Sequence, residues 1–260
     1  MLRNKVALVT GSATGLGKMT ALALARQGCD VIVNYVNSRE QAEKLSEHIR
    51  SLGVQSIAVR ADISDYDQVK AMMRQVQMQW SEGIDILVNN AGPFIRERRY
   101  FSEYAREEID YLVQGNLVGV MYLDQLVLPM MRDQKWGRII HFGFGRAMES
   151  RGWPHRAVYA AAKVGLVSFT KSLAVEEAEH GITVNMICPG DIRGQNKEKR
   201  IDEVRHLHDE ESPRGRPGTG EDVTRIISFL CQHESDYITG NIIDVSGGLD
   251  PIRTLPMDRS

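Results

Sequence analysis

The chain has 260 residues, 42% of them hydrophobic and 25% charged, a composition that excludes an intrinsically disordered or fibrous protein. Lysine and arginine number 32 against 34 aspartates and glutamates, and the net charge of −2 gives no overall positive field to attract nucleic acid or an anionic membrane. The three scattered cysteines, Cys29, Cys188 and Cys231, suit neither a disulfide framework nor a metal site. We therefore expect a soluble, cytoplasmic protein without metal, nucleic-acid or membrane partners.

Short β-branched runs alternate with segments of helical spacing along the chain. The expected strands are residues 6–9, 31–33, 57–59, 84–88, 138–140, 183–186 and 242–245. Continuous apolar strands suit a parallel sheet that is covered on both faces, and strict alternation implies right-handed crossovers. The pattern predicts a single α/β domain over residues 1–260, a Rossmann fold with a doubly wound parallel seven-stranded sheet and helices on both faces.

Two polar segments interrupt the alternation, at residues 144–156 and 190–220. The second mixes charged residues with prolines and glycines, which is typical of a mobile flap outside the carboxyl ends of the strands, where ligands bind in such sheets. We expect this segment, about 190–220, to form a substrate flap. Residues 250–260 are expected to form a surface tail or an oligomer contact.

A glycine-rich turn follows the first expected strand and opens a helix. The first N–H groups of a helix and its dipole favour a bound phosphate, and glycine lets the backbone approach a pyrophosphate closely. Strand, turn and helix come in the order of a dinucleotide-binding site. The predicted contacts in this turn are Gly11, Ser12, Thr14, Gly15, Leu16 and Gly17.

The spacing of these glycines resembles that of the short-chain dehydrogenase/reductase family. Three further motifs match in the same order, namely Asn89-Asn90-Ala91-Gly92, Tyr159-Ala160-Ala161-Ala162-Lys163 and Pro189-Gly190. The similarity extends over essentially the whole chain and is greatest to the 3-oxoacyl-[acyl-carrier-protein] reductase branch, which also shares Gly137-Arg138-Ile139-Ile140. The resemblance implies a nicotinamide dinucleotide cofactor and carbonyl reduction.

The residues themselves suggest the acid–base chemistry. Tyr159 and Lys163 are four residues apart, so on a helix both side chains face the same site. A neighbouring ammonium and a cationic nicotinamide favour the phenolate, so we expect the pKa of Tyr159 to be lowered toward neutral pH. By the resemblance, Lys163 also holds the nicotinamide ribose, and Asn116 bends its helix and anchors a water that relays protons to Lys163.

One catalytic position departs from the family. The serine that normally follows the fifth strand is replaced by Phe144, counting from Gly137-Arg138-Ile139-Ile140. Losing an oxyanion donor typically lowers turnover by about 10²–10³ unless another group replaces it. A backbone N–H between Gly143 and Gly145 or a water is our first choice of substitute, with Ser150 and His155 as alternatives. Phe144 and Trp153 are expected to form an apolar wall for the substrate.

Cofactor preference depends on the residues after the second strand. No acidic residue stands there to bind the ribose 2′-hydroxyl of NAD, whereas Asn34, Ser38 and Arg39 could bind a 2′-phosphate. We predict NADP(H) rather than NAD(H). The resemblance adds Asp62 and Ile63 at the adenine, and further cofactor contacts at Asn90, Ala91, Gly92, Pro189, Gly190 and Ile192.

We therefore expect an NADP(H)-dependent reductase of a 3-oxoacyl-thioester-like carbonyl, as in fatty acid biosynthesis. One alternative is reduction of another ketone, such as a sugar, steroid, pterin or aromatic ketone. Another is a nucleotide-binding protein with little turnover, because Phe144 replaces the serine. An acyl carrier protein stays an open partner, since Lys135 suits an acidic carrier but Glu176, Glu177 and Glu179 beside His180 do not. The resemblance implies a homodimer or homotetramer through the helices of Asn116 and Tyr159.

Overall fold

The computed structural model describes residues 2–252. The strands are β1 (Val6–Val9), β2 (Asp30–Tyr35), β3 (Ser56–Arg60), β4 (Ile86–Asn89), β5 (Gly137–Phe142), β6 (Ile182–Pro189) and β7 (Ile242–Val245). The α-helices are α1 (Gly15–Ala25), α2 (Arg39–Ser51), α3 (Tyr66–Gln79), α4 (Arg106–Val113), α5 (Gly119–Gln134), α6 (Ala157–Glu177), α7 (Ile201–Val204) and α8 (Gly220–Leu230). Short turns include the π-helical η2 (Gln114–Val118) and the 3-10 helices η1 (Phe101–Glu103), η3 (Ala147–Glu149), η4 (Ala178–His180), η5 (Gly194–Glu198) and η6 (His233–Ser235).

The seven strands form one parallel sheet in the order β3-β2-β1-β4-β5-β6-β7. The predicted fold is confirmed, including the number of strands. Chain order reverses between β1 and β4, because the first half of the sheet is wound outward from β1 in one direction and the second half in the other. In sheets of this kind the crevice at the reversal point binds ligands.

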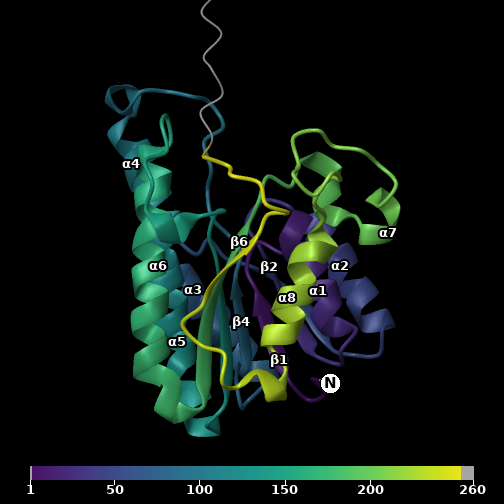
Figure 1. Cartoon of the computed structure of the whole chain (residues 1–260). Helices are drawn as coiled ribbons and strands as arrows, with labels where there is room; N and C mark the ends of the chain where they lie inside the picture. The colour runs from purple at the N-terminus through teal and green to yellow at the C-terminus, as the bar shows by residue number, and fades with distance from the viewer. Residues whose placement is uncertain (1, 253–260) are drawn as a thin grey trace, which may run out of the picture.

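Two helical layers cover the sheet, as Figure 1 shows. Ala7 and Val9 of β1 pack with residues of α1, α2 and α8 in one apolar core. Val6 and Leu8 of the same strand pack with residues of α3, α5 and α6 in the other. Because strand side chains alternate between faces, a strand buried on both sides needs a continuous apolar run, which explains the sequence pattern.

Helix α6 is the long central helix of one layer. With η4 it spans Ala157–His180, which is long and apolar enough to cross a membrane, and 50% of its apolar window is buried inside the molecule. Among residues 2–252 it is the one helix that meets this test. Packing against β6 and η2 explains the apolar composition as that of a core helix.

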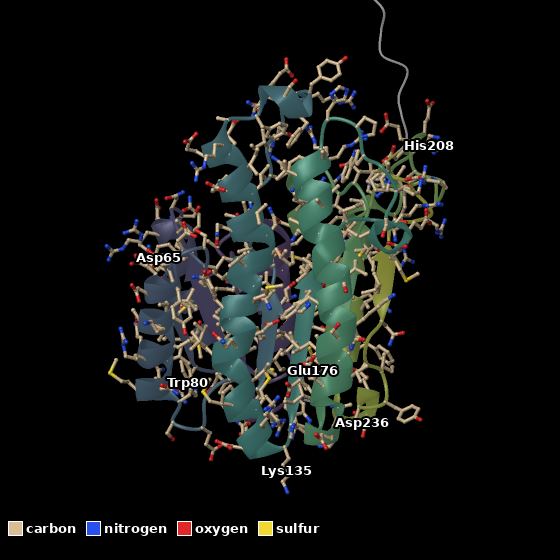
Figure 2. All side chains as sticks on the ribbon, turned by 90° about the vertical axis from the view of Figure 1, so that its left-hand side faces the viewer. Asp65, Trp80, Lys135, Glu176, His208 and Asp236 are labelled. Atoms are coloured by element: carbon tan, nitrogen blue, oxygen red, sulfur yellow. The ribbon has the colours of Figure 1, made fainter. Side chains whose placement is uncertain are left out.

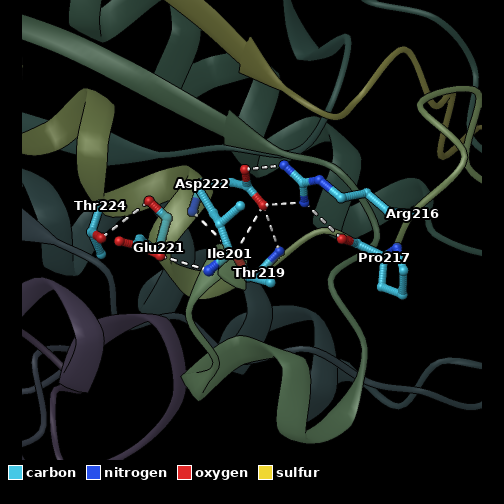
Figure 3. A network of polar contacts seen from close by, with 7 residues as sticks. All are labelled: Ile201, Arg216, Pro217, Thr219, Glu221, Asp222 and Thr224. Atoms are coloured by element: carbon cyan, nitrogen blue, oxygen red, sulfur yellow. Dashed lines mark hydrogen bonds and ion pairs between the residues drawn. The ribbon is translucent and has the colours of Figure 1, made fainter. Parts of the chain in front are cut away.

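The flap segment, residues 190–220, runs from β6 to α8 and contains η5 and α7. The start of α8 ties it down, as Figure 3 shows: Arg216 forms a bidentate pair with Asp222 at 2.7 and 2.9 Å, and the Ile201 N–H donates to Glu221 at 2.6 Å. Thr219 caps α8 by accepting from the Asp222 N–H at 3.3 Å. The middle of the flap is thus anchored to a helix start.

The end of the described chain packs beside residues that follow β5. Ile252 is 3% exposed and packs in a core cluster with Phe144 and Trp153. Asp250 pairs with Arg151 at 2.5 Å. The surface-tail alternative is therefore wrong for Ile252, because its apolar side chain is buried, whereas Asp250 and Pro251 are partly exposed. The oligomer-contact alternative stays a prediction. Residues 253–260 of that expectation lie outside the described range.

Candidate active site

The turn between β1 and α1 has the backbone that a bound pyrophosphate needs. Gly11 and Gly15 have φ values of +58° and +62°, a region that side chains disfavour. A Cβ on Gly17 would lie 2.5 Å from Gly11 O, so no larger residue fits there. The turn thus combines open backbone with the N-terminus of α1, and these residues fit a dinucleotide phosphate.

Side chains from the β4 loop hold this turn in place. Thr10 Oγ1 accepts from the N–H groups of Asn90 and Ala91, each at 3.0 Å. Asn90 Nδ2 donates to the carbonyls of Thr10 and Gly11 at 2.9 and 3.1 Å. The first and second family motifs are therefore one hydrogen-bonded unit at the reversal point of the sheet.

A carboxylate from the flap already occupies the N-terminus of α1. Glu198 accepts from the Gly15 N–H at 2.7 Å and from Lys18 Nζ at 2.6 Å, and these two donors hold its pKa below the ordinary glutamate range although partial burial opposes the shift. The helix end therefore binds an anion, as its dipole predicts. Sequence reasoning missed this residue, because no local signal connects it to Gly15, which lies 183 positions earlier in the chain.

The expected 2′-phosphate contacts are only partly available. Asn34 is 1% exposed. Its Oδ1 accepts from the Gly11 N–H at 3.1 Å and its Nδ2 donates to Ala61 O at 3.0 Å. The prediction that Asn34 binds the phosphate directly is therefore wrong; it supports the glycine turn instead. Arg39 is exposed and pairs with Glu43 at 2.7 Å, and Ser38 precedes α2 without capping it.

The adenine residues lie after β3 as expected from the motif order. Asp62 accepts from the N–H and hydroxyl of Ser64 at 2.9 and 2.7 Å, and Ile63 is buried with the core. Their contact with adenine stays a prediction.

Lys163 and Asn116 converge beside Gly92. A Cβ on Gly92 would lie 2.5 Å from Asn116 Oδ1 and 3.5 Å from Lys163 Nζ. Asn116 Nδ2 donates to Pro93 O at 2.8 Å, whereas its buried Oδ1 has no partner within residues 2–252. A buried acceptor without a donor suits an ordered water. This geometry fits the relay that the resemblance implies for Asn116.

Burial changes the pKa values of Tyr159 and Lys163, both on α6. It raises the pKa of Tyr159 above the ordinary tyrosine range, with the nearby Cys188 adding to the shift. It lowers the pKa of Lys163 to about 8, and the Lys163 ammonium donates to Phe142 O at 2.8 Å. Without a bound nicotinamide, desolvation of the phenolate therefore outweighs any lowering of the Tyr159 pKa by Lys163. The lowering expected with a cationic nicotinamide in place stays a prediction.

Tyr159 faces a cavity of about 880 Å³ at the carboxyl edge of the sheet. Three aromatic rings surround the phenol: Phe94 at 4.9 Å between ring centroids, and Phe144 and Trp153 at 6.1 Å each. Phe144 and Trp153 therefore stand where the sequence predicts a wall, whereas Phe94 was not anticipated. Pro189, Gly190 and Ile192 also line the cavity, so the β6 motif meets the α6 motif there.

The groups proposed to replace the serine differ in whether they are free to bind a substrate oxygen in the cavity. The Gly143 and Gly145 N–H groups donate to Ile187 O at 2.8 Å and Pro189 O at 3.1 Å, so the backbone substitution at these two positions is wrong. Ser150 is exposed and lines a separate surface depression. His155 lines the cavity with Tyr159, and its buried Nδ1 has no hydrogen-bond partner within residues 2–252.

The fold and this arrangement define an oxidoreductase that binds a nicotinamide dinucleotide at the edge of a doubly wound sheet. A family model described as enoyl-(acyl carrier protein) reductase matches residues 11–250. The chain belongs to the short-chain dehydrogenase/reductase family. Membership confirms the resemblance that the motifs indicated.

Relatives of known name cover nearly the whole chain. A Bacillus subtilis protein provisionally named oxidoreductase YtkK is 42% identical over 95% of this chain and 96% of its own. The 3-oxoacyl-[acyl-carrier-protein] reductase FabG of Staphylococcus aureus is 38% identical over 96% of this chain and 99% of its own length. A solved Bacillus thuringiensis structure, provisionally described as a 3-oxoacyl-reductase, has a TM-score of 0.88 at 43% identity, covering 96% and 99%. The acetoin dehydrogenase YohF of Salmonella typhimurium has a TM-score of 0.84 at 28% identity, covering 94% and 95%.

Proposed function

We propose that the protein is an NADP(H)-dependent carbonyl reductase that acts on a 3-oxoacyl-thioester-like substrate. The observation that carries this proposal is the placement of Tyr159 on the cavity wall, with Lys163 and the unpartnered Asn116 Oδ1 converging behind it at Gly92. A merely nucleotide-binding protein has no need for these three groups in one place.

The residues divide the chemistry among them. A bound reduced nicotinamide would supply the hydride to the carbonyl carbon. The Tyr159 hydroxyl, which its raised pKa keeps protonated at neutral pH before substrate binds, donates this proton as the substrate oxygen takes on negative charge. Lys163 and Asn116 form the path by which a water-borne proton returns to the phenolate. His155 is our choice for the second hydrogen bond to the substrate oxygen.

Preference for NADP(H) rests on Arg39. Its guanidinium is exposed and pairs with Glu43 on the same helix, and such solvent-exposed pairs contribute little stability, so a 2′-phosphate can replace Glu43 as its partner. No carboxylate follows β2 directly to select the 2′-hydroxyl of NAD. We expect Arg39→Ala to raise the KM for NADPH at least tenfold while leaving that for NADH unchanged.

The thioester class is supported by charge at the cavity rim. Arg98 and Lys197 line the cavity, and neither has a carboxylate partner in the part of the chain that the structure describes. Two free cations above an apolar floor suit a ligand with an apolar carbonyl end and a phosphate-bearing arm, as a thioester of coenzyme A or of a carrier has.

A second candidate is the reduction of a compact or cyclic ketone. The rings of Phe94, Phe144 and Trp153 around Tyr159 favour it, because they narrow the space beside the phenol. The similarity to acetoin dehydrogenase YohF also supports a small substrate.

The position of Lys135 bears on how an acyl carrier protein would dock. Figure 2 shows Lys135 at the opposite end of the molecule from His208 in the flap, so a carrier bound at Lys135 would lie at the far end of its own subunit from the flap. We infer a homodimer or homotetramer through α5 and α6, which would bring the two ends of neighbouring chains together. The three cysteines of the protein are buried free thiols. Free thiols support a location in the reducing cytoplasm.

The test is a comparison of substrates and cofactors with purified protein. We expect acetoacetyl-coenzyme A to be reduced with NADPH at a kcat/KM at least tenfold above that with NADH. Efficient turnover of acetoin or a cyclic ketone without turnover of the thioester would favour the second candidate. Tight NADPH binding with no turnover of any carbonyl would favour a binding protein.

A further inference from the structure

A buried chain of hydrogen bonds crosses the core beneath the cavity. Asn89 Nδ2 donates to Asp124 Oδ1 at 2.8 Å, and Asp124 Oδ2 lies 2.9 Å from His141 Nε2. On the other side of the imidazole, Nδ1 lies 2.8 Å from Thr170 Oγ1, whose hydroxyl donates to Leu166 O at 2.7 Å. The four polar residues are at most 1% exposed, so bulk water cannot replace these bonds.

The directions of the bonds determine where the protons lie. The single hydroxyl proton of Thr170 is used on Leu166 O, so His141 Nδ1 must carry a proton and donate it. Asp124 Oδ2 and His141 Nε2 cannot face each other with lone pairs alone at 2.9 Å, so a second proton lies between them. The Asp124–His141 pair is therefore neutral as a unit, which its burial favours, since an uncompensated carboxylate in the core is costly.

On the sheet side, this hydrogen-bond network joins two strands, β4 and β5, that lead directly into the site. Asn89 ends β4 and is followed by Asn90, which clamps the glycine-rich turn. His141 lies on β5 beside Phe142, whose carbonyl holds the Lys163 ammonium at 2.8 Å. Asn89 and His141 are also register partners in the sheet.

On the helix side, this hydrogen-bond network joins the two segments that carry the residues of the proton relay. Asp124 stands on α5, eight residues after Asn116 in the adjoining η2 turn. Thr170 stands on α6, two helical turns after Lys163. One buried pair thus contacts four elements, each of which positions a different group of the candidate active site.

We propose that Asp124 and His141 are positioning residues, whose shared proton fixes β4, β5, α5 and α6 in the arrangement that brings Asn116, Tyr159 and Lys163 together. Neither residue touches the cavity. The role rests on the proposed function in one respect, namely that these three residues carry the reaction. Hydrogen-bond geometry at both ends of the imidazole makes the arrangement directional, which apolar packing of the same volume would not be.

Replacing Asp124 separates geometry from charge. In Asp124→Asn the amide can accept from Asn89 and donate to a neutral His141 ring, so every bond of the chain is kept. In Asp124→Ala both bonds are lost. We expect kcat within about threefold of wild type for Asp124→Asn and at least tenfold lower for Asp124→Ala, because an orphaned buried polar group forces the elements to shift. The KM for NADPH should change less than threefold in both.

A remote buried hydrogen bond provides the matched control. Ser46 Oγ donates to Ser56 Oγ at 3.0 Å between α2 and β3, far from the α6 residues in the fold. Ser46→Ala should lower the melting temperature as a core hydrogen-bond deletion does, yet leave kcat unchanged. A purely structural role for Asp124 would give the same result, so unchanged kcat in Asp124→Ala would overturn the proposal.

Two readouts do not depend on activity. In ¹⁵N spectra of the full chain we expect a protonated, exchange-protected Nδ1 on His141, and a ring without that proton would overturn the proposal. We also expect Asp124→Ala to raise the Lys163 pKa from about 8 toward its ordinary value, followed by side-chain NMR, as water enters beside a displaced α6. An unchanged Lys163 pKa in Asp124→Ala would overturn the proposal, whereas the absence of carbonyl turnover in wild type would count against the proposed function alone.

Discussion

Glu198 and Lys18, 180 residues apart in the chain, form an ion pair at 2.6 Å directly over the glycine-rich turn. The same carboxylate accepts from the first N–H of α1. The flap is therefore fastened to the turn by an anion at the point where a dinucleotide phosphate is expected. Cofactor binding and flap position are coupled if the phosphate and Glu198 use the same donors.

We predict that Glu198→Gln binds NADPH about five- to tenfold more tightly than wild type. The substitution keeps an oxygen for Gly15 but removes a negative charge and frees Lys18, and charges near a helix N-terminus contribute about 0.3–1 kcal/mol each, with charge-assisted hydrogen bonds adding to this. Fluorescence titration gives the dissociation constants. Glu203→Gln in α7 is the control, since Glu203 accepts from Arg200 N within the flap. Equal or weaker binding by Glu198→Gln would mean that phosphate and carboxylate bind side by side.

Phe144→Ser restores the hydroxyl that the family normally has at this position. We expect kcat to rise by about 10- to 100-fold, because an oxyanion donor is worth about 10²–10³ in turnover and another group already compensates in part. Stability should fall by about 3 kcal/mol, since a buried aromatic ring is lost. Phe144→Ala makes the same cavity without a hydroxyl, and a kcat as high in this variant would show that space, not a donor, limits turnover.

His155→Ala tests which group compensates. If the imidazole binds the substrate oxygen, we expect kcat to fall at least tenfold and to recover in the His155→Ala/Phe144→Ser double variant, because the new hydroxyl takes over the same bond. Steady-state kinetics of the two single variants and the double variant give the coupling. An unchanged kcat in His155→Ala would point to water as the donor.

Ile252 tests the part of the cavity wall that comes from the chain end. Because Ile252 is 3% exposed, Ile252→Ala should reduce the free energy of unfolding by about 2–4 kcal/mol. The widened wall should also lower the KM for a 3-oxoacyl thioester with a longer acyl chain relative to acetoacetyl-coenzyme A. Val175→Ala, at a position 79% exposed on α6, should change neither quantity. If the ratio of the KM for the longer thioester to the KM for acetoacetyl-coenzyme A were the same in both variants, Ile252 would have no part in substrate selection.

The lowered pKa of Lys163 makes stability depend on pH in a defined direction. The Lys163 side chain loses its proton near pH 8 in the folded chain and at about pH 10 in the unfolded chain. Between these two pH values the unfolded state therefore binds more protons than the folded state. Stability attributable to Lys163 therefore rises with pH, by up to about 1.4 kcal/mol per pH unit. The raised Tyr159 pKa acts only above about pH 10, with the opposite sign. Urea unfolding of wild type and Lys163→Met at pH 7–10 should give diverging curves; parallel curves would contradict the burial of a charged Lys163.

The local sequence pattern was sufficient to predict the sheet and the glycine-rich turn. Continuous apolar runs predict strands covered on both faces, and the glycines of the first turn predict a backbone with a positive φ, as Gly11 has. Asn34 shows where local pattern stops: its position after an apolar run suggested a ligand contact, but the neighbouring strand and turn use both ends of its amide. Glu198 and Ile252 reach the site only through folding of distant segments, which no spacing in the sequence reveals.

The measurement that bears most directly on the proposed reaction is NADPH oxidation with acetoacetyl-coenzyme A by wild type and Tyr159→Phe at matched cofactor saturation. Because Phe keeps the ring among Phe94, Phe144 and Trp153 but has no proton to donate, we predict turnover by wild type and a loss of at least 10²-fold in Tyr159→Phe, with NADPH affinity unchanged. Undiminished turnover in Tyr159→Phe would contradict the assignment of Tyr159 as the proton donor and, with it, the proposed mechanism.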